Sequence, residues 1–422
     1  MKVLLISANT ETITMPVLPL GLACVAAATR NAGHEVVLLN LMFAGDPMVG
    51  LKTAIEDLRP EVIGISVRNI DDQNMPQPHF LLLSVRDVVA ACRARSDAPI
   101  VLGGAGYSIF PEAALRYLGA DIGVPGEGEV VFPLLLDRIA ARGALSEVPG
   151  IHLPGRPVQR RHFALQLDDL PVPDPGSWIP SSLRPQELWV PVETRRGCPL
   201  DCSYCSTALI QGASIRSRSP AQIVKWLAKL AEAGCRNINF VDNTFNLPPA
   251  YAKELCRRIR EARLDLNLWC IIYPMLIDPE LVELMRAAGC RQISFGFESG
   301  SDRMLRSLNK QFGVEEIRAT SQFFAEAGIK RMGFLLLGGP GETKETVEES
   351  LAFADSLKLE ALKITTGLRI YPQTPLAITA LAEGIVEADD DLLFPRFYLQ
   401  SELKGWLLER VATYKVSRPW VN

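Results

Sequence analysis

The chain has 422 residues, of which 48% are hydrophobic, and its formal net charge is −4. This length favours two domains with connecting segments, and the absence of a Lys- and Arg-rich cluster interleaved with aromatic residues disfavours a nucleic-acid partner. The N-terminal residues do not resemble a secretion signal and no apolar run is long enough to cross a bilayer, so we expect a cytoplasmic protein with no membrane contact.

Residues 1–145 alternate short apolar runs with segments of helix length. Apolar runs separated in this way are typical of a parallel sheet that is covered by helices on both faces. We therefore predict an α/β, doubly wound, Rossmann-like domain. Its clearest elements are strands at 3–6, 36–39, 62–67 and 100–102 and a helix at 20–31.

Polar or glycine-rich loops follow several of these strands, where ligands of doubly wound sheets bind. The loop after the fourth strand does not match the G-x-G-x-x-G dinucleotide motif, which disfavours a nicotinamide cofactor. The segment from Pro99 through Gly103 and Gly104 to Glu129 instead resembles a cobalamin-binding domain, and the match covers most of residues 1–140. The resemblance suggests cobalamin or another ligand at Ser66, Arg68, Asn69, Gly103, Gly104, Gly126 and Glu127.

Two departures from cobalamin domains bear on this prediction. The first loop, residues 7–12, contains no histidine, whereas domains of the methionine-synthase type carry a histidine that binds cobalt there. Arg68 occupies a position that is apolar in related domains. It could face the corrin, or it could pair with Asp71 or Asp72 as an ordinary loop arginine.

Residues 146–190 contain eight prolines at 149, 154, 157, 171, 173, 175, 180 and 185. Proline at this density interrupts helices and central strands. We predict a linker without chemistry of its own.

Cys198, Cys202 and Cys205 follow this linker with the spacing C-x3-C-x2-C. A structural zinc ion or a fully protein-held iron–sulfur cluster needs four ligands, and no fourth donor lies nearby in the sequence. Three thiolates around a cubic cluster would leave one iron open to a small molecule. A zinc knuckle is the alternative interpretation.

The cysteine motif, with Tyr204 directly before Cys205, resembles the signature of the radical S-adenosylmethionine (SAM) superfamily. The resemblance implies a [4Fe–4S] cluster on Cys198, Cys202 and Cys205, with SAM bound to the open iron. It also implies reductive cleavage of SAM to a 5′-deoxyadenosyl radical, supported by a cytosolic electron donor such as flavodoxin or ferredoxin.

Residues 191–375 again alternate strand and helix patterns, and six or more βα units predict a parallel (β/α)6 partial barrel. The predicted strands are 189–193, 237–241, 267–272, 292–297, 332–337 and 363–370, and the predicted helices are 221–233, 249–262, 279–288, 314–327 and 344–357.

The family resemblance also implies SAM contacts at the strand ends. These are Tyr204 beside the cluster, Asn243 and Thr244 for the amino group, Glu298 and Ser299 for the ribose, Lys310 for the carboxylate, and Gly338 and Gly339 on the adenine side. The alternatives are a turn or cap at Asn243 and Glu298 and a solvated lysine at Lys310.

Trp269, Tyr273, Arg369 and Tyr371 end predicted strands and are candidates for substrate contacts, although packing would explain each of them equally well. Residues 376–422 are too short for a separate domain and are rich in aromatic residues. We expect this extension to pack on the barrel, as core filling or as a lid.

These features predict a radical SAM enzyme that acts on an unactivated carbon of a small biosynthetic intermediate, with cobalamin-dependent methyl transfer as the leading hypothesis. One alternative is a radical dehydration, deoxygenation, epimerisation or rearrangement, with the first domain as a scaffold. Another is a non-catalytic sensor of metal or cobalamin.

Overall fold

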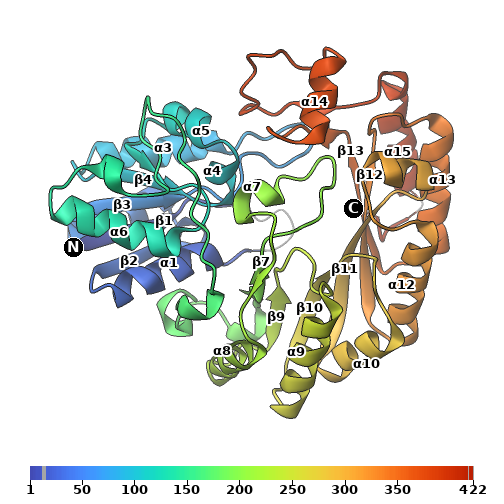
Figure 1. The fold of residues 1–422 in the computed structure, drawn as a ribbon, viewed down its shortest axis with the longest axis horizontal. Coiled ribbons are helices and arrows are strands. Elements are labelled where there is room, and N and C mark those ends of the chain that lie inside the picture. Colours follow the sequence, from blue (N-terminus) through green and yellow to red (C-terminus); the bar gives the residue numbers. More distant parts are fainter. Residues whose placement is uncertain (12–15, 417, 422) are drawn as a thin grey trace. The chain divides into compact units, whose positions relative to one another are not determined.

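The structure is a computed structural model that describes residues 1–11, 16–416 and 418–421 (Figure 1). The chain forms two compact units. Unit 1 comprises Met1–Asp72, His79–Arg184 and Thr207–Ser217, and unit 2 comprises Gln73–Pro78, Pro185–Ser206 and Arg218–Asn422. No helix in the described ranges combines the length and apolar character needed to span a membrane.

Unit 1 contains a five-stranded parallel sheet in the order β2-β1-β3-β4-β5, which confirms the predicted doubly wound fold. Helices cover the sheet, and α1 packs against α6 around apolar side chains of β1 such as Val3 and Leu5. The strands are β1 (Lys2–Ser7), β2 (Glu35–Asn40), β3 (Val62–Ser66), β4 (Ile100–Gly103) and β5 (Ile122–Gly123), and the helices are α1 (Leu20–Asn31), α2 (Pro47–Leu58), α3 (Leu82–Arg93), α4 (Ala105–Ile109), α5 (Pro111–Leu118) and α6 (Gly128–Ala140).

The proline-rich stretch belongs to unit 1, so the boundaries that we predicted at residues 145 and 190 differ from those in the structure. His152 and Gly123 exchange main-chain hydrogen bonds at 2.7 and 2.8 Å, which adds residue 152 to the edge of β5. The main-chain N–H of Ala164 donates to Glu127 at 2.8 Å, and Arg216 forms an ion pair with Glu127 at 2.7 Å. Proline content predicted irregular backbone but could not indicate these long-range contacts.

Unit 2 contains a six-stranded parallel sheet in the order β13-β12-β11-β10-β9-β6, the partial barrel that the sequence predicted. Its helices lie on the outer side of the sheet (Figure 1). The strands are β6 (Trp189–Val192), β9 (Asn237–Phe240), β10 (Asn267–Ile272), β11 (Cys290–Glu298), β12 (Lys330–Leu337) and β13 (Ala361–Thr366), and the helices are α8 (Pro220–Glu232), α9 (Pro249–Glu261), α10 (Pro279–Ala287), α11 (Asp302–Ser307), α12 (Val314–Glu326) and α13 (Lys344–Ser356).

Local sequence explains where these helices begin. Ser219 precedes Pro220, and its hydroxyl accepts a hydrogen bond from the N–H of Gln222 at 3.3 Å. Asp278 caps α10 in the same way, because its carboxylate accepts from the N–H of Leu281 at 2.8 Å. A polar cap followed by proline stabilises the first turn and stops the preceding loop from continuing as helix.

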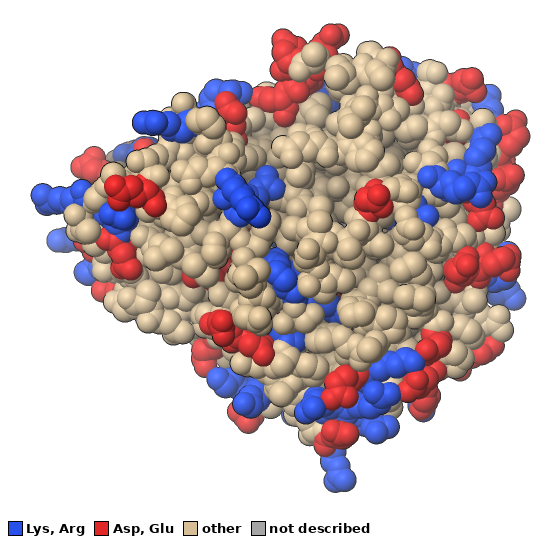
Figure 2. Space-filling view, viewed as in Figure 1, with Lys and Arg blue, Asp and Glu red and all other residues tan. Residues whose placement is uncertain are grey.

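The C-terminal extension packs on unit 2. The strands β14 (Leu368–Arg369) and β15 (Phe397–Tyr398) pair antiparallel, and two further helices, α14 (Pro375–Ala382) and α15 (Trp406–Val416), were not predicted. The N–H of Leu362 on β13 donates to the carbonyl of Trp420 at 2.9 Å, so the extension pairs with the outer edge of the sheet. On the face shown in Figure 2, basic and acidic side chains are interspersed.

Candidate active site

The three motif cysteines lie in the loop that follows the carboxyl end of β6. Cys198 and Cys202 are buried, whereas Cys205 is exposed. Burial raises the pKa values of the Cys198 and Cys202 thiols, and the neighbouring motif cysteines raise them further. The thiols of this short loop are thus close enough to influence the pKa values of Cys198 and Cys202.

Hydrogen bonds outside the motif anchor this loop within unit 2. The N–H of Ser203 donates to the carbonyl of Leu308 at 3.0 Å, and the carbonyl of Ser203 accepts from the N–H of Leu376 at 2.8 Å. The amide of Asn309 donates to the carbonyl of Asp201 at 3.1 Å. The loop that carries the cysteines is thus fixed by the segment after α11 and by the start of α14.

The donor set fits an iron–sulfur cluster. Three cysteine thiols from one loop are the ligand type that binds such clusters, each at a different iron. Among residues 1–11, 16–416 and 418–421, no three His, Cys, Asp or Glu side chains lie close enough together to hold a single metal ion.

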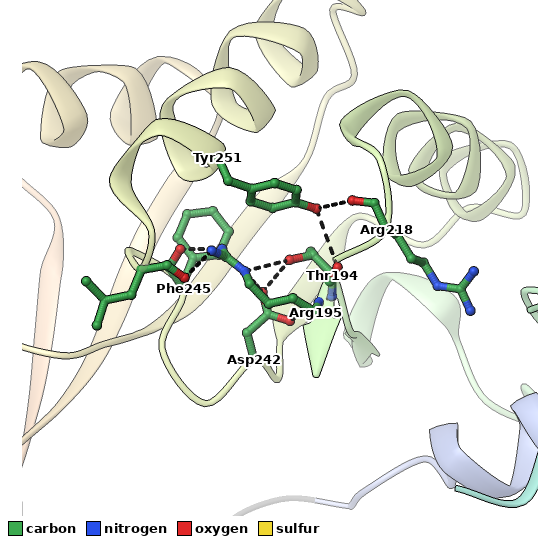
Figure 3. Close-up of polar contacts among 7 residues, drawn as sticks. Thr194, Arg195, Arg218, Asp242, Phe245 and Tyr251 are labelled. Carbon is green, nitrogen blue, oxygen red and sulfur yellow. Dashed lines mark hydrogen bonds and ion pairs between the residues drawn. The ribbon is translucent and has the colours of Figure 1, made fainter. Parts of the chain in front are cut away.

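Asp242 is buried, and its carboxylate binds the segment that leads to the cysteines (Figure 3). It follows β9, and its Oδ1 accepts from the N–H groups of Thr194 at 2.7 Å and Arg195 at 3.2 Å. Its Oδ2 accepts from the Thr194 hydroxyl at 2.6 Å. Residues 194 and 195 lie four and three residues before Cys198, so Asp242 fixes the point where the cysteine loop begins.

Arg195 balances the charge of Asp242 and joins this turn to the loop after β9. Its Nε lies 3.6 Å from Oδ2 of Asp242, and its guanidinium donates to the carbonyls of Phe245 and Leu247. The guanidinium also lies 4.4 Å from the centre of the Tyr251 ring. Because both charges are paired and hydrogen-bonded, their burial is tolerated.

Tyr204, Glu298 and Lys310 meet in a second buried cluster beside the cysteine loop. Lys310 Nζ donates to the Tyr204 hydroxyl at 2.9 Å and lies 3.3 Å from Glu298 Oε1. The Tyr204 hydroxyl donates to the same Glu298 oxygen at 2.9 Å. The rings of Tyr204, Tyr273 and Phe312 lie 5.1, 5.6 and 5.9 Å from the ammonium, within the range of cation–π attraction.

The charges in this cluster stabilise one another. Burial opposes the positive charge of Lys310, but Glu298 and Tyr204 outweigh it and raise the pKa of the ammonium well above its usual value. Burial, together with Glu298, raises the pKa of the Tyr204 phenol. A register shift at the end of β11 and a φ of +59° turn Glu298 out of the strand, an arrangement common at functional sites.

Other predicted SAM contacts have internal partners. Thr244 is buried in the loop after β9, and Asn243 precedes it. The Ser299 hydroxyl shares a hydrogen bond with the Ser350 hydroxyl at 2.9 Å and accepts from the N–H of Ser301 at 3.1 Å. These contacts explain why Ser299 is fully buried, whereas the neighbouring Glu298 side chain contacts Tyr204 and Lys310.

Gly338 and Gly339 begin a loop after β12 that is held by Glu342. The carboxylate Oε2 of Glu342 accepts from the N–H groups of Gly338 and, at 3.1 Å, of Gly339. Among the described residues, its Oε1 is buried without a hydrogen-bond partner. Burial raises the pKa of Glu342 to about 7, although the two N–H groups oppose this shift.

The four substrate candidates make contacts within unit 2. Trp269 donates from Nε1 to the Ser294 hydroxyl at 2.9 Å and packs edge-on against Trp189. The Tyr273 hydroxyl accepts from the N–H of Gln311 at 3.0 Å. Arg369 is buried and donates to the carbonyls of residues 370, 392 and 393, and its guanidinium lies 5.2 Å from the centre of the Tyr371 ring.

Unit 1 has its own crevice at the carboxyl ends of β1 and β3, the point where the strand order of the sheet reverses. Arg68 stands there, and partial desolvation lowers the pKa of its guanidinium. In the amide orientation of Asn69 that gives both its oxygen and its nitrogen a partner, the oxygen accepts from Arg68 Nη1 at 3.3 Å and the nitrogen donates to the Arg68 carbonyl at 3.1 Å. The crevice is lined by Ala8, Asn9, Thr10, Glu11, Ser66, Val67, Arg68, Asn69, Leu81, Ser84 and Val85.

The remaining predicted residues of unit 1 make contacts that shape or hold the backbone of nearby loops. Gly104 has a φ of +98°, and a Cβ there would lie 2.6 Å from the carbonyl oxygen of Val67. Gly103 precedes it at the end of β4. Gly126 donates its N–H to the Ser108 hydroxyl at 2.8 Å, and Glu127 is engaged by Arg216 and Ala164 as described above.

Sequence reasoning missed Thr194, Arg195, Asp242 and Glu342. Asp242 directly precedes Asn243, a predicted SAM contact, and Thr194 and Arg195 lie shortly before the cysteine motif. The available signal was the acidic residue Asp242 at the end of a buried strand. Its partner Thr194 lies 48 residues away in the sequence, so the sequence did not indicate the contact.

Comparison with known proteins agrees with this geometry. The model of the radical SAM superfamily matches residues 192–354, and that of the B12 binding domain matches residues 6–136. An uncharacterized methyltransferase of Pyrococcus horikoshii is 26% identical over 408 residues, which cover 92% of this chain and 84% of the relative. The tryptophan 2-C-methyltransferase of Streptomyces laurentii is 26% identical over 445 residues, which cover 89% and 74%.

A solved structure shares the fold across nearly the whole chain. It is the radical SAM methyltransferase TsrM from Kitasatospora setae with cobalamin and a [4Fe–4S] cluster bound, and it superposes with a TM-score of 0.87 at 22% identity, covering 99% of this chain and 90% of that one. Fold and site define an α/β protein with a three-cysteine cluster motif at the strand ends of a partial barrel. The family matches show a B12 binding domain ahead of a radical SAM domain in this chain.

Proposed function

We propose that this protein is a cobalamin-dependent radical SAM methyltransferase that acts on an unreactive carbon of a small molecule. The observation that carries the proposal is the three-cysteine loop at the first strand end of a radical SAM barrel, in a chain that also has a B12 binding domain. The relatives named as methyltransferases support methyl transfer as the reaction.

Cys198, Cys202 and Cys205 would hold the [4Fe–4S] cluster and leave one iron for SAM. When bound, the cluster supplies an electron for SAM cleavage and cobalamin supplies the methyl group. Asp242 and Arg195 would keep the cysteine loop in place while the cluster is bound, because they anchor the turn from which the loop starts.

Lys310 and Glu298 would bind the carboxylate and the ribose of SAM, with Tyr204 between them. These groups satisfy one another in the structure. Binding of SAM would therefore exchange internal hydrogen bonds for bonds to the ligand, without leaving a buried charge unpaired. We assign the SAM amino group to Asn243 and Thr244 and the adenine side to Gly338 and Gly339.

The crevice at Ser66, Arg68 and Asn69 would take cobalamin. It lies at the strand-order reversal where ligands of such sheets bind, and Arg68 offers a cationic group in a loop region that lacks histidine. Gly103 and Gly104 allow close approach of the backbone there.

We further propose that the reaction takes place in the cytoplasm, where free thiols persist and a flavodoxin or ferredoxin can supply electrons. The substrate class is a small biosynthetic molecule. L-Tryptophan is the first probe, because it is named as the substrate of the Streptomyces laurentii relative.

The test uses anaerobically purified protein with a reconstituted cluster and added methylcobalamin, a chemical reductant and SAM that carries a deuterated methyl group. We expect about four irons per chain, retention of the corrin after desalting, and S-adenosylhomocysteine formed together with methylated product. Cys198→Ala should remove cluster and turnover, whereas Cys235→Ala, which changes a buried cysteine outside the motif, should keep both.

Formation of 5′-deoxyadenosine without S-adenosylhomocysteine on the true substrate would refute methyl transfer and support a radical reaction without it. Protein that holds neither iron nor corrin after reconstitution would refute the enzyme assignment.

A further inference from the structure

The loop at residues 338–342 has few side chains of its own, so its shape depends on groups that bind its main chain. Gly338 and Gly341 have φ values of +103° and +76°, in the region that favours glycine. Glu342 binds the N–H groups of Gly338 and Gly339, and the N–H of Glu342 donates back to the carbonyl of Gly339 at 3.1 Å.

Two side chains of α11 bind the middle of the loop. The Ser307 hydroxyl donates to the carbonyl of Pro340 at 2.8 Å. Arg303 Nη2 donates to the carbonyl of Gly341 at 3.1 Å. The helix that follows Glu298 thereby supports the loop from one side.

The C-terminal extension binds both ends of the same loop through one residue. The main-chain N–H of Gln400 donates to the carbonyl of Gly338 at 2.9 Å, and its side-chain Oε1 accepts from the N–H of Gly341 at 3.0 Å. With these two bonds, every main-chain N–H and carbonyl of residues 338–341 has a partner. Leu399 packs against the loop as well, because a Cβ on Gly338 would lie 2.7 Å from its Cδ1.

Gln400 is itself held in place. It follows β15, which pairs with β14 in a separate two-stranded sheet. The Tyr398 hydroxyl lies 3.2 Å from Gln400 Oε1 and donates to Glu383 at 2.7 Å. The extension therefore presents the Gln400 amide oxygen toward Gly341 in a defined orientation.

We propose that Gln400 is a positioning residue for SAM binding, and that the C-terminal extension completes the SAM site by fixing the loop at residues 338–341. This inference rests on the proposed function, which assigns the loop to the adenine side of SAM. A loop held in its binding conformation before SAM arrives loses less conformational entropy when SAM binds.

The test compares Gln400→Met, which keeps the side-chain length but removes the amide oxygen, with Gln400→Glu, which keeps an acceptor. Equilibrium dialysis measures the dissociation constant of SAM on cluster-reconstituted protein. Loss of one hydrogen bond corresponds to about three- to tenfold weaker binding for Gln400→Met, and Gln400→Glu should stay within about twofold of the wild type. Gln322→Met on α12 is the matched control, because the exposed Gln322 amide donates to Glu326 at 2.8 Å, away from the loop.

Iron content and the cluster absorbance spectrum should be the same in all four proteins, because a positioning role leaves the cysteine loop intact. The inference would be overturned if Gln400→Met bound SAM as tightly as the wild type, or if Gln400→Glu lost as much SAM affinity as Gln400→Met. It would also be overturned if a variant lost iron together with SAM binding. In each case, SAM binding by the wild-type protein would still support the proposed function. A wild-type protein with a full cluster that binds no SAM would overturn both.

Discussion

Lys310 Nζ lies 3.3 Å from Glu298 Oε1, and their side chains are only 4% and 12% exposed. The two residues come from different segments, the end of β11 and the loop after α11. A buried pair of this kind adds little net stability compared with an apolar pair, but removal of one partner leaves the other charge buried and unpaired.

Lys310→Met should therefore destabilise the protein strongly. We expect a loss of about 3–5 kcal/mol in the free energy of unfolding, because among the described residues Glu298 would keep only the Tyr204 hydroxyl as a hydrogen-bond partner. Urea denaturation of the cluster-free protein measures the change. Lys253→Met is the control, since the acidic partners of Lys253 are exposed, and it should change the midpoint little. Equal shifts in the two variants would contradict the prediction.

Asp242→Asn should impair cluster assembly. An amide in place of the carboxylate would leave at least one of the three donors from Thr194 and Arg195 unpaired, at about 1–3 kcal/mol for each lost acceptor. We expect less than half of the wild-type iron per chain after reconstitution, measured by iron assay and cluster absorbance. Asp278→Asn makes the same chemical change at a helix cap where Asn also serves, and it should retain full iron. Wild-type iron content in Asp242→Asn would show that the turn holds without the carboxylate.

Glu342 should make stability depend on pH. Its pKa of about 7 in the folded protein lies above the ordinary value of 4.5, so between these values the folded state holds a proton that the unfolded state lacks. The free energy of unfolding therefore falls as the pH rises through this window. Glu342→Gln lacks this titration and should gain up to about 3 kcal/mol relative to the wild type between pH 5 and pH 8.

Urea denaturation of both proteins at pH 5, 6, 7 and 8 tests this prediction. The Gln amide oxygen can still accept from Gly338 and Gly339, and its NH₂ group would replace the buried oxygen that has no partner among the described residues. Parallel curves across the series would mean that Glu342 does not titrate in this window.

Gly104→Ala should distort the crevice that we propose for cobalamin. At a φ of +98°, with a Cβ 2.6 Å from the Val67 carbonyl oxygen, alanine forces the loop after β3 to move. We expect a loss of about 1–3 kcal/mol and reduced corrin retention after desalting. Gly119→Ala also has a positive φ, but its Cβ would meet open space, so it should cost about 1 kcal/mol and keep corrin retention unchanged. Equal corrin retention in the two variants would argue against a binding role for the Gly104 loop.

Much of the fold was predictable because its signals are local. The predicted helix at 20–31 coincides with α1, and the predicted strand at 267–272 coincides with β10, since apolar periodicity and flanking polar residues mark both elements. The cysteine spacing likewise identified a cluster motif without reference to the rest of the fold. The division into units was less predictable, because Glu127 is joined to Ala164 and Arg216 by contacts that span 37 residues or more.

The sequence by itself determined the two α/β units, the order of their elements and the thiols available to a cluster, because hydrophobic period and residue chemistry are properties of short segments. Only the tertiary structure decided that Asp242 supports Thr194, that Lys310 pairs with Glu298, and that Gln400 clamps the loop at Gly338. These pairings depend on strand order and register, which bring distant side chains to the same end of a sheet and then bury them too deeply to remain unpaired.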